Sequence, residues 1–267
     1  MEKLRLMLLG IAALALVALG AQVFRARAPA MAATVPAASM ASSAAQPQDA
    51  RAQVIASFQK LASFRPYYDN LATALPDEYA RVVNAVAKQE DKSPATSDDA
   101  NMALAMRYVR ENYGALAGHA QGADLDRILK AQQAILNAMG DSDPGLCVSF
   151  FYGGGSPGFA DFSAKHRDLI AELAQANLAA IIAGKANKTK IADPSDADVQ
   201  MLDDALVVAK VSPAAIDLLL DNKSPDPPLS DAQMCRAGQD YLSALLGLSS
   251  SVRWRLMSRS LILAARS

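Results

Sequence analysis

Two cysteines carry the chemistry that is easiest to predict from this sequence. Cys147 and Cys235 are the only thiols among 267 residues, and they lie on either side of a predicted long helix, 160–184. In an oxidising compartment two such thiols are expected to form a disulfide, which would stabilise the fold by about 4 kcal/mol in the chain-entropy model. The alternative is two separately buried thiols that pack as small apolar side chains. A catalytic cysteine is not supported, because no histidine neighbourhood is recognisable.

The two histidines are the candidate general bases. His166 lies four residues after Phe162, so helical spacing places it on an apolar stripe, which is typical of a core or boundary histidine. A general base would need a carboxylate such as Asp168 or Glu172 to orient it, but these positions point to other faces of the same helix. His119 is predicted to lie exposed in a loop. Neither histidine supports a named mechanism.

Two polar segments have the composition of binding loops but lack their spacing. Residues 152–158 contain four glycines but no lysine, and no strand is predicted before them, so a connector is favoured over a phosphate loop. Asp193, Asp196 and Asp198 lack the glycine and glutamate of a calcium loop and are better explained as helix caps. The sequence therefore predicts no catalytic residue, cofactor or metal site. Paired carboxylates stay open, because the spacing of acids along a chain does not show their separation in space.

The composition favours helices and argues against one class of partner. Alanine occupies 55 positions and favours helix over strand, so the predicted fold class is all-α. Lysine and arginine number 26 against 27 acidic residues, for a net charge of -1. Nucleic-acid-binding domains are usually strongly basic, so no nucleic-acid partner is expected.

An uncharged segment of 19 residues, 6–24, predicts how the protein is held in the cell. At about 1.5 Å per residue, a helix of this length just crosses the roughly 30 Å hydrocarbon core of a bilayer. Lys3 and Arg5 precede the segment, and Arg25 and Arg27 follow it. Its length favours an uncleaved transmembrane anchor over a signal peptide, whose apolar region usually has about 7 to 15 residues. A buried soluble helix is the third interpretation.

Residues 28–50 are predicted to be a flexible linker, because alanine, proline and serine dominate them and supply no bulky side chains for a core. The basic flanks of the anchor do not decide its orientation. A linker between membrane and domain favours a single-pass inner-membrane protein with its domain in the periplasm. Cleavage at the small residues 30–32 would instead release it into the periplasm. The predicted domains are an anchor or signal segment, 1–27, this linker, and a helical domain, 51–267.

The helical domain is predicted to contain about eight helices around one core, because apolar residues recur at helical spacing almost throughout. The later helices are expected at 160–184, 197–210, 213–221 and 231–265, the last interrupted near Gly247. Prolines at 225, 227 and 228 break the chain before it. Start signals are the capping-box pairs Thr96 with Asp99, Ser195 with Asp198 and Ser230 with Gln233, and first-turn prolines at Pro76 and after Ser212.

Charge is distributed unevenly over the last third of the chain. Residues 193–231 contain nine aspartates and two lysines, whereas residues 236–267 contain five arginines and one aspartate. The two regions are predicted to attract each other inside the fold. The alternative places residues 252–256 on an anionic membrane surface. Internal packing is favoured, because the apolar residues that follow cover too wide an arc for an interfacial helix.

The predicted order of inner-membrane anchor, Ala/Pro-rich linker and all-helical periplasmic domain resembles that of the lipase-specific foldases, which are steric chaperones. Residues 236–244, Arg-Ala-Gly-Gln-Asp-Tyr-Leu-Ser-Ala, also resemble their Arg-x-x-Phe-Asp-Tyr motif in part. Gln239 replaces the aromatic residue, one residue is missing before the leucine, and the segment lies near the end of the domain. These departures favour a chance match, so the resemblance guides only the chaperone-like alternative.

The leading hypothesis is a membrane-tethered bacterial cell-envelope protein with no catalysis of its own. It would bind a protein partner in the envelope, as a scaffold or chaperone-like module, and contact the inner membrane through residues 6–24. The rival hypothesis is a helical envelope hydrolase that uses paired carboxylates. The separation of the two acids across a cleft would decide between them.

Overall fold

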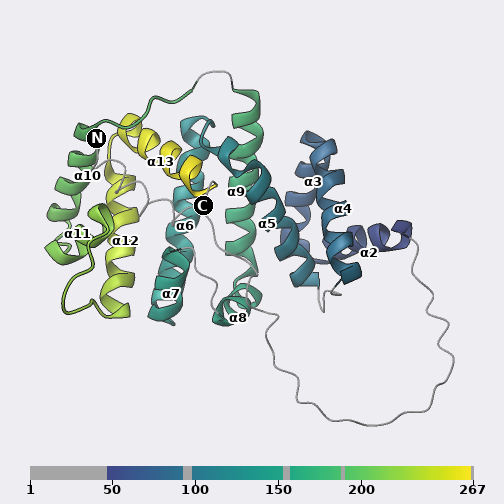
Figure 1. Cartoon of the computed structure of the whole chain (residues 1–267), viewed down its shortest axis with the longest axis horizontal. Coiled ribbons are helices and arrows are strands. Elements are labelled where there is room, and N and C mark those ends of the chain that lie inside the picture. Colours follow the sequence, from purple (N-terminus) through teal and green to yellow (C-terminus); the bar gives the residue numbers. More distant parts are fainter. Residues whose placement is uncertain (1–46, 93–97, 153–156, 188–189, 266–267) are drawn as a thin grey trace, which may run out of the picture.

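The structure is a computed structural model that describes residues 47–92, 98–152, 157–187 and 190–265. These ranges contain helices and no strands, which confirms the predicted all-α class (Figure 1). They form twelve α-helices rather than the predicted eight. The predicted anchor and nearly all of the linker lie outside the described residues. The linker's last residues, 47–50, belong to the first described helix.

The helices of the described ranges are α2 (Pro47–Lys60), α3 (Arg65–Ala74), α4 (Pro76–Lys92), α5 (Asp98–Ala117), α6 (Gly122–Gly140), α7 (Pro144–Phe151), α8 (Pro157–Lys165), α9 (Arg167–Ala186), α10 (Asp196–Val208), α11 (Pro213–Asp221), α12 (Asp231–Gly247) and α13 (Ser250–Ala264), with a 3-10 turn, η2 (Ala62–Phe64), between α2 and α3.

Three of the helix starts follow the local signals in the sequence. The side chains of Ser195 and Ser230 each accept a hydrogen bond from the backbone N–H three residues later. The side chains at those later positions in turn accept a hydrogen bond from the backbone N–H of the serine, so both predicted capping boxes are confirmed. The side chain of Ser212 caps α11 by accepting a hydrogen bond from the backbone N–H of Ala215, and Pro213 follows it in the first turn. Such caps satisfy backbone donors that have no partner inside the helix. Thr96 lies outside the described residues.

The predicted helix 160–184 is two helices, which corrects the sequence interpretation. α8 ends at Lys165 and α9 begins at Arg167, because His166 has a non-helical backbone with φ -122° and ψ 41°. Apolar spacing continues on both sides of the break, so periodicity could not reveal it. The predicted interruption of 231–265 is confirmed, since α12 ends at Gly247 and α13 begins at Ser250.

Helix α9 is the centre of the fold and packs against α5 on one side and α6 on the other (Figure 1). Helices α2 to α4 pack together at the α5 end of the molecule, and α10 to α12 lie at the opposite end. Within the described ranges, α9 is the one helix long and apolar enough to span a membrane, but half of that apolar window is buried in the fold. A core helix meets the same criterion.

Helices α5 and α9 run parallel and meet at both ends. Near their starts, Arg167 donates to Asp99 with Nη2 and Oδ2 2.8 Å apart. Near their ends, Gly184 lies so close to α5 that a Cβ there would overlap the carbonyl oxygen of Leu116. Asn187 just beyond α9 also donates to the carbonyl oxygen of His119, at 3.0 Å. The two helices are therefore held in register over their whole length.

Replacing Gly184 with alanine tests this close approach. The new methyl group has to push α5 and α9 apart, so Gly184→Ala is expected to lower the free energy of unfolding by about 1–3 kcal/mol, although alanine improves helix propensity by about 1 kcal/mol. Gly247→Ala is the matched control, because no atom lies within 4 Å of a Cβ at that helical glycine. Denaturant unfolding of both variants gives the comparison, and equal stability of the two would contradict the packing described.

Candidate functional site

The two cysteines meet as the sequence predicts. Cys147 in α7 and Cys235 in α12 are buried, with their sulfur atoms 2.00 Å and their Cα atoms 5.6 Å apart, at disulfide distance. The pair joins two helices that are 88 residues apart in the sequence. Because it is buried between α7 and α12, this pair has a structural position.

The histidines and their predicted partners are not brought together. His166 is half-buried at the start of α9, where its ring stacks on Phe162 with centroids 4.4 Å apart, so it is the boundary histidine that the sequence favours. The hydroxyl of Ser63 donates to Asp168, and Arg127 binds Glu172 at 2.7 Å. His119 is half-buried in the turn after α5 rather than exposed, because the start of α6 follows within three residues.

Five carboxylates of the described residues form short ion pairs with basic side chains of other helices. The shortest N–O distance in each of these ion pairs is 3 Å or less. Such charge-assisted contacts between helices suit a structural role. The pairs are Asp99 with Arg167, Glu172 with Arg127, Glu78 with Lys185, Asp126 with Arg253, and Asp198 with Arg255.

The acidic and basic regions near the C-terminus attract each other as predicted. Arg255 binds Asp198, and Arg259 lies 3.8 Å from Asp193. The segment 252–256 packs into the fold, where the indole N–H of Trp254 donates to Asp126 at 3.0 Å. Internal packing of this segment is therefore confirmed.

Asp198 is the most strongly perturbed of these carboxylates. It is 2% exposed and accepts hydrogen bonds from Arg255 and from both the backbone N–H and the hydroxyl of Ser195. Hydrogen bonding to Arg255, reinforced by Ser195, lowers the pKa of Asp198 to about 2 against the opposing effect of burial. Asp198 thus fixes the start of α10 and ties it to α13.

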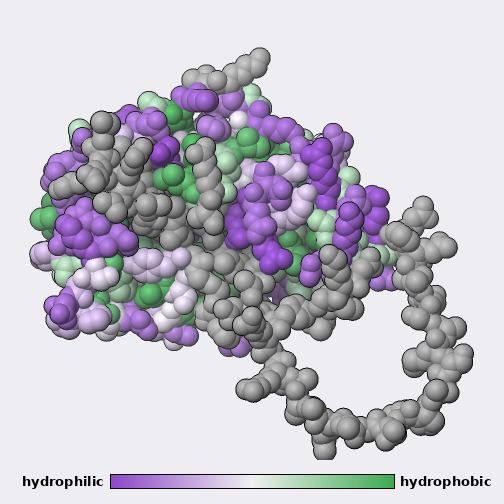
Figure 2. All heavy atoms as spheres, in the orientation of Figure 1, coloured by the Kyte–Doolittle hydropathy of each residue, from purple (hydrophilic) through white to green (hydrophobic). Residues whose placement is uncertain are grey.

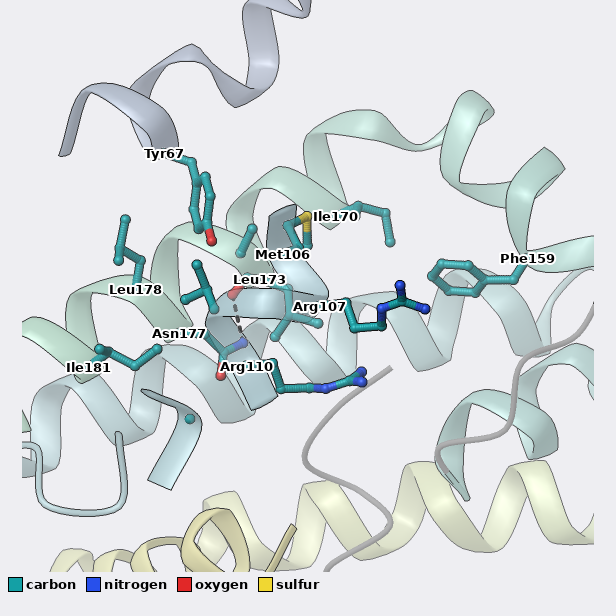
Figure 3. Close-up of a pocket in the computed structure, with 13 residues that line it drawn as sticks. Tyr67, Met106, Arg107, Arg110, Phe159, Ile170, Leu173, Asn177, Leu178 and Ile181 are labelled. Carbon is teal, nitrogen blue, oxygen red and sulfur yellow. Dashed lines mark hydrogen bonds between the residues drawn. The ribbon is translucent and has the colours of Figure 1, made fainter. Parts of the chain in front are cut away.

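A pocket between α5 and α9 is the best candidate site for a ligand (Figure 3). Tyr67 of α3 and Phe159 of α8 also line it. Gly114 on α5 and Ala174 on α9 are small, and they leave space between helices whose ends are held together. Its apolar lining also includes Met106, Val109, Ile170, Leu173, Leu178 and Ile181.

Four polar side chains reach the pocket: Tyr67, Asn177, Arg107 and Arg110. Asn177 uses its amide N–H to bond the carbonyl oxygen of Leu173 at 2.8 Å. Figure 3 shows Tyr67 entering on one side, while the guanidinium groups of both arginines extend toward the side on which Phe159 lies. As far as the described residues form it, the lining contains no carboxylate, histidine or thiol.

The sequence interpretation missed this pocket. One local signal was present, because Arg107 and Arg110 stand one position after the apolar residues Met106 and Val109 and share a helix face. Residues 153–156, which make up most of the predicted connector at 152–158, lie outside the described residues, so the connector cannot be placed relative to the pocket. No protein-family model, curated protein or solved structure matches the chain.

The buried ion pair predicts a pH dependence of stability. The folded-state pKa of Asp198, about 2, lies below the ordinary value of 3.8, so the pair stabilises the fold above about pH 4 and this stability is lost as the pH falls toward 2. Asp198→Asn is expected to lower the free energy of unfolding by about 2 kcal/mol at pH 7. It should also reduce the amount by which this free energy falls between pH 4 and pH 2. Urea unfolding at several pH values measures both effects.

Asp193→Asn is the control for this experiment, because Asp193 is 81% exposed and lies 3.8 Å from its arginine. It should leave stability within about 0.5 kcal/mol of the wild type. An acid profile of Asp198→Asn that parallels the wild type would show that this carboxylate does not control the transition.

Proposed function

We propose that this protein is a non-catalytic binding module of the bacterial cell envelope, and that its helical domain takes up an envelope component in the pocket between α5 and α9. Residues 6–24 hold it in the inner membrane, and the domain lies in the periplasm. The length of the apolar segment, the linker after it, and a cysteine pair at disulfide distance support this location, since disulfides persist in oxidising compartments.

The chemistry of the pocket lining carries the proposal. Arginine stays charged at any physiological pH, and the carboxamide of Asn177 does not titrate. Burial raises the pKa of Tyr67, so its phenol stays protonated at neutral pH. Such groups bind anions and polar atoms, but they supply neither a nucleophile nor a general base.

A protein partner, which the sequence predicts, is supported by a separate surface. Three apolar side chains of α10 are at least half exposed: Met201, Val207 and Val208. On the face drawn in Figure 2, hydrophilic and apolar residues are otherwise mixed in small patches where the described residues are visible. A scaffold role would use the α10 residues for docking and leave the pocket for the smaller ligand.

The location is tested with reporter fusions after Ala50. A reporter that is active only outside the cytoplasm should be active, and one that is active only in the cytoplasm should be silent. Labelling the denatured, unreduced protein should detect no free thiol, because Cys147 and Cys235 are joined. The reverse reporter pattern, or two reactive thiols per chain, would exclude the periplasm.

The binding role is tested by filling the pocket. The full chain purified from its own envelope should release a small molecule on denaturation, detected by mass spectrometry and counted per mole of protein. Ala174→Leu puts a larger side chain into the pocket and should reduce the released amount about tenfold, while the exposed Ala186→Leu at the end of α9 should match the wild type. A wild-type protein that releases nothing, or equal release from Ala174→Leu, would contradict the proposal.

A further inference from the structure

Helix α10 has apolar side chains on its outer surface as well as on the face that it packs into the fold. Leu202 and Leu206 are buried in the core. Met201, Val207 and Val208 are 50%, 60% and 82% exposed, on a helix that lies at one end of the molecule (Figure 1). Exposed apolar side chains that lie together, rather than singly, are typical of a surface that binds a partner.

The outer surface of α10 has the spacing of one half of a coiled coil. Four residues make up this stripe, the α10 seam, and all are exposed: Ala197, Met201, Asp204 and Val208. They follow one another at intervals of four, three and four residues, which is the alternation that directs side chains along one stripe toward a partner helix. The seam is about 16 Å long, so about three turns of a second helix fit along it.

The α10 seam carries a negative charge at its centre. Helix α10 contains four aspartates and no lysine or arginine. Asp198 is paired inside the fold, whereas Asp204, on the seam, accepts a hydrogen bond from the neutral amide of Gln200 at 2.9 Å and forms no ion pair with a described residue. A partner that covers the seam has to supply a cation for Asp204, because an unpaired carboxylate is costly to remove from water.

The same charge disfavours two other occupants of the seam. In a parallel pair of α10 helices from two copies of the chain, Asp204 would face its own counterpart, and in an antiparallel pair it would face Met201 or Val208. Neither arrangement gives it a cation. Lys210 follows the helix in a left-handed conformation, with φ 61°, so it does not continue the seam. An anionic bilayer would repel the carboxylate.

We propose that the α10 seam binds a basic amphipathic helix of an envelope protein, with apolar side chains against Met201 and Val208 and a lysine or arginine against Asp204. This inference rests on the proposed function, whose protein partner it describes by its chemistry. Apolar contacts on both sides of the ion pair exclude water from it, so the pair selects the partner. A helix with an acidic or apolar residue at the central position matches only part of the seam.

Two cross-linked helical peptides test the charge requirement on the full chain in nanodiscs of zwitterionic lipid, with empty nanodiscs as the blank. Both have leucine at two core positions seven residues apart, and the core residue between them is lysine in one peptide and glutamate in the other. Fluorescence anisotropy should show that the lysine peptide binds at least about tenfold more tightly than the glutamate peptide. Equal binding, or no binding of the lysine peptide, overturns the proposal.

Reversing the charge at the seam should reverse this preference. Asp204→Lys should bind the glutamate peptide more tightly than the lysine peptide. Asp161→Lys, at an exposed aspartate of α8, makes the same change in net charge and should keep the preference of the wild type. Circular dichroism shows whether each variant is folded, and Asp204→Asn, which should abolish the preference, replaces Asp204→Lys if the latter is unfolded. A preference that survives at residue 204 overturns the proposal.

Photo-cross-linking of the full chain in its own envelope identifies the natural occupant. Met201→benzoylphenylalanine should form an adduct with an envelope protein, and mass spectrometry should locate the link in a segment that has a lysine or arginine within one helical turn. Asp161→benzoylphenylalanine is the control and should not form this adduct. An adduct with a second copy of the chain, with lipid or with an acidic segment overturns the proposal, as does the absence of any adduct.

These results also separate this inference from the proposed function. If Ala174→Leu reduces the released ligand but the α10 seam shows neither a charge preference nor an adduct, the partner assignment is wrong and the pocket still defines a binding module. If the seam selects the lysine peptide but the wild type releases no ligand, the role of the pocket is wrong and the partner assignment remains. If both experiments fail, both proposals are wrong.

Discussion

The parallel contact between α5 and α9 is the constraint on which the rest of the structure depends. Gly184 permits it at one end, because any side chain there would overlap the backbone of α5 at Leu116. Asp99 and Arg167 meet at the other end; both are about 41% exposed, so their pair sets register more than it adds stability. Because α5 and α9 are held together at both ends, they cannot move closer to fill the space beside the small residues in the middle. The pocket at Gly114 and Ala174 follows from that geometry, and its arginines come from the face of α5 beside the contact.

The outer helices are fastened to this centre by polar and covalent links. Arg253 binds Asp126 and ties α13 to α6, while Arg255 binds Asp198 and ties the same helix to α10. The cysteine pair joins α7 to α12. The α5–α9 pocket lies between these links, and apolar side chains and two arginines line it together.

The sequence predicts those features that depend on residues close together in the chain, or for which the sequence offers one possible partner. The capping boxes at Ser195 and Ser230 are local, and only two thiols were available to pair. The number of helices was underestimated, since the short joint at His166 does not interrupt the apolar spacing, whereas Pro76 correctly marked the start of α4. The pocket could not be predicted, because Tyr67, Arg110, Phe159 and Ala174 come from four helices whose packing no local pattern specifies. Its one local signal, a pair of arginines beside an apolar stripe, is also typical of a solvated helix face.

A crystal structure of the full chain purified from its own envelope tests the central claim most directly. The account predicts electron density for a bound component in the pocket between Met106 and Leu173, with α5 and α9 still in contact at Gly184. A ligand bound on another surface, or one that enters only when α5 and α9 separate at Gly184, would contradict it.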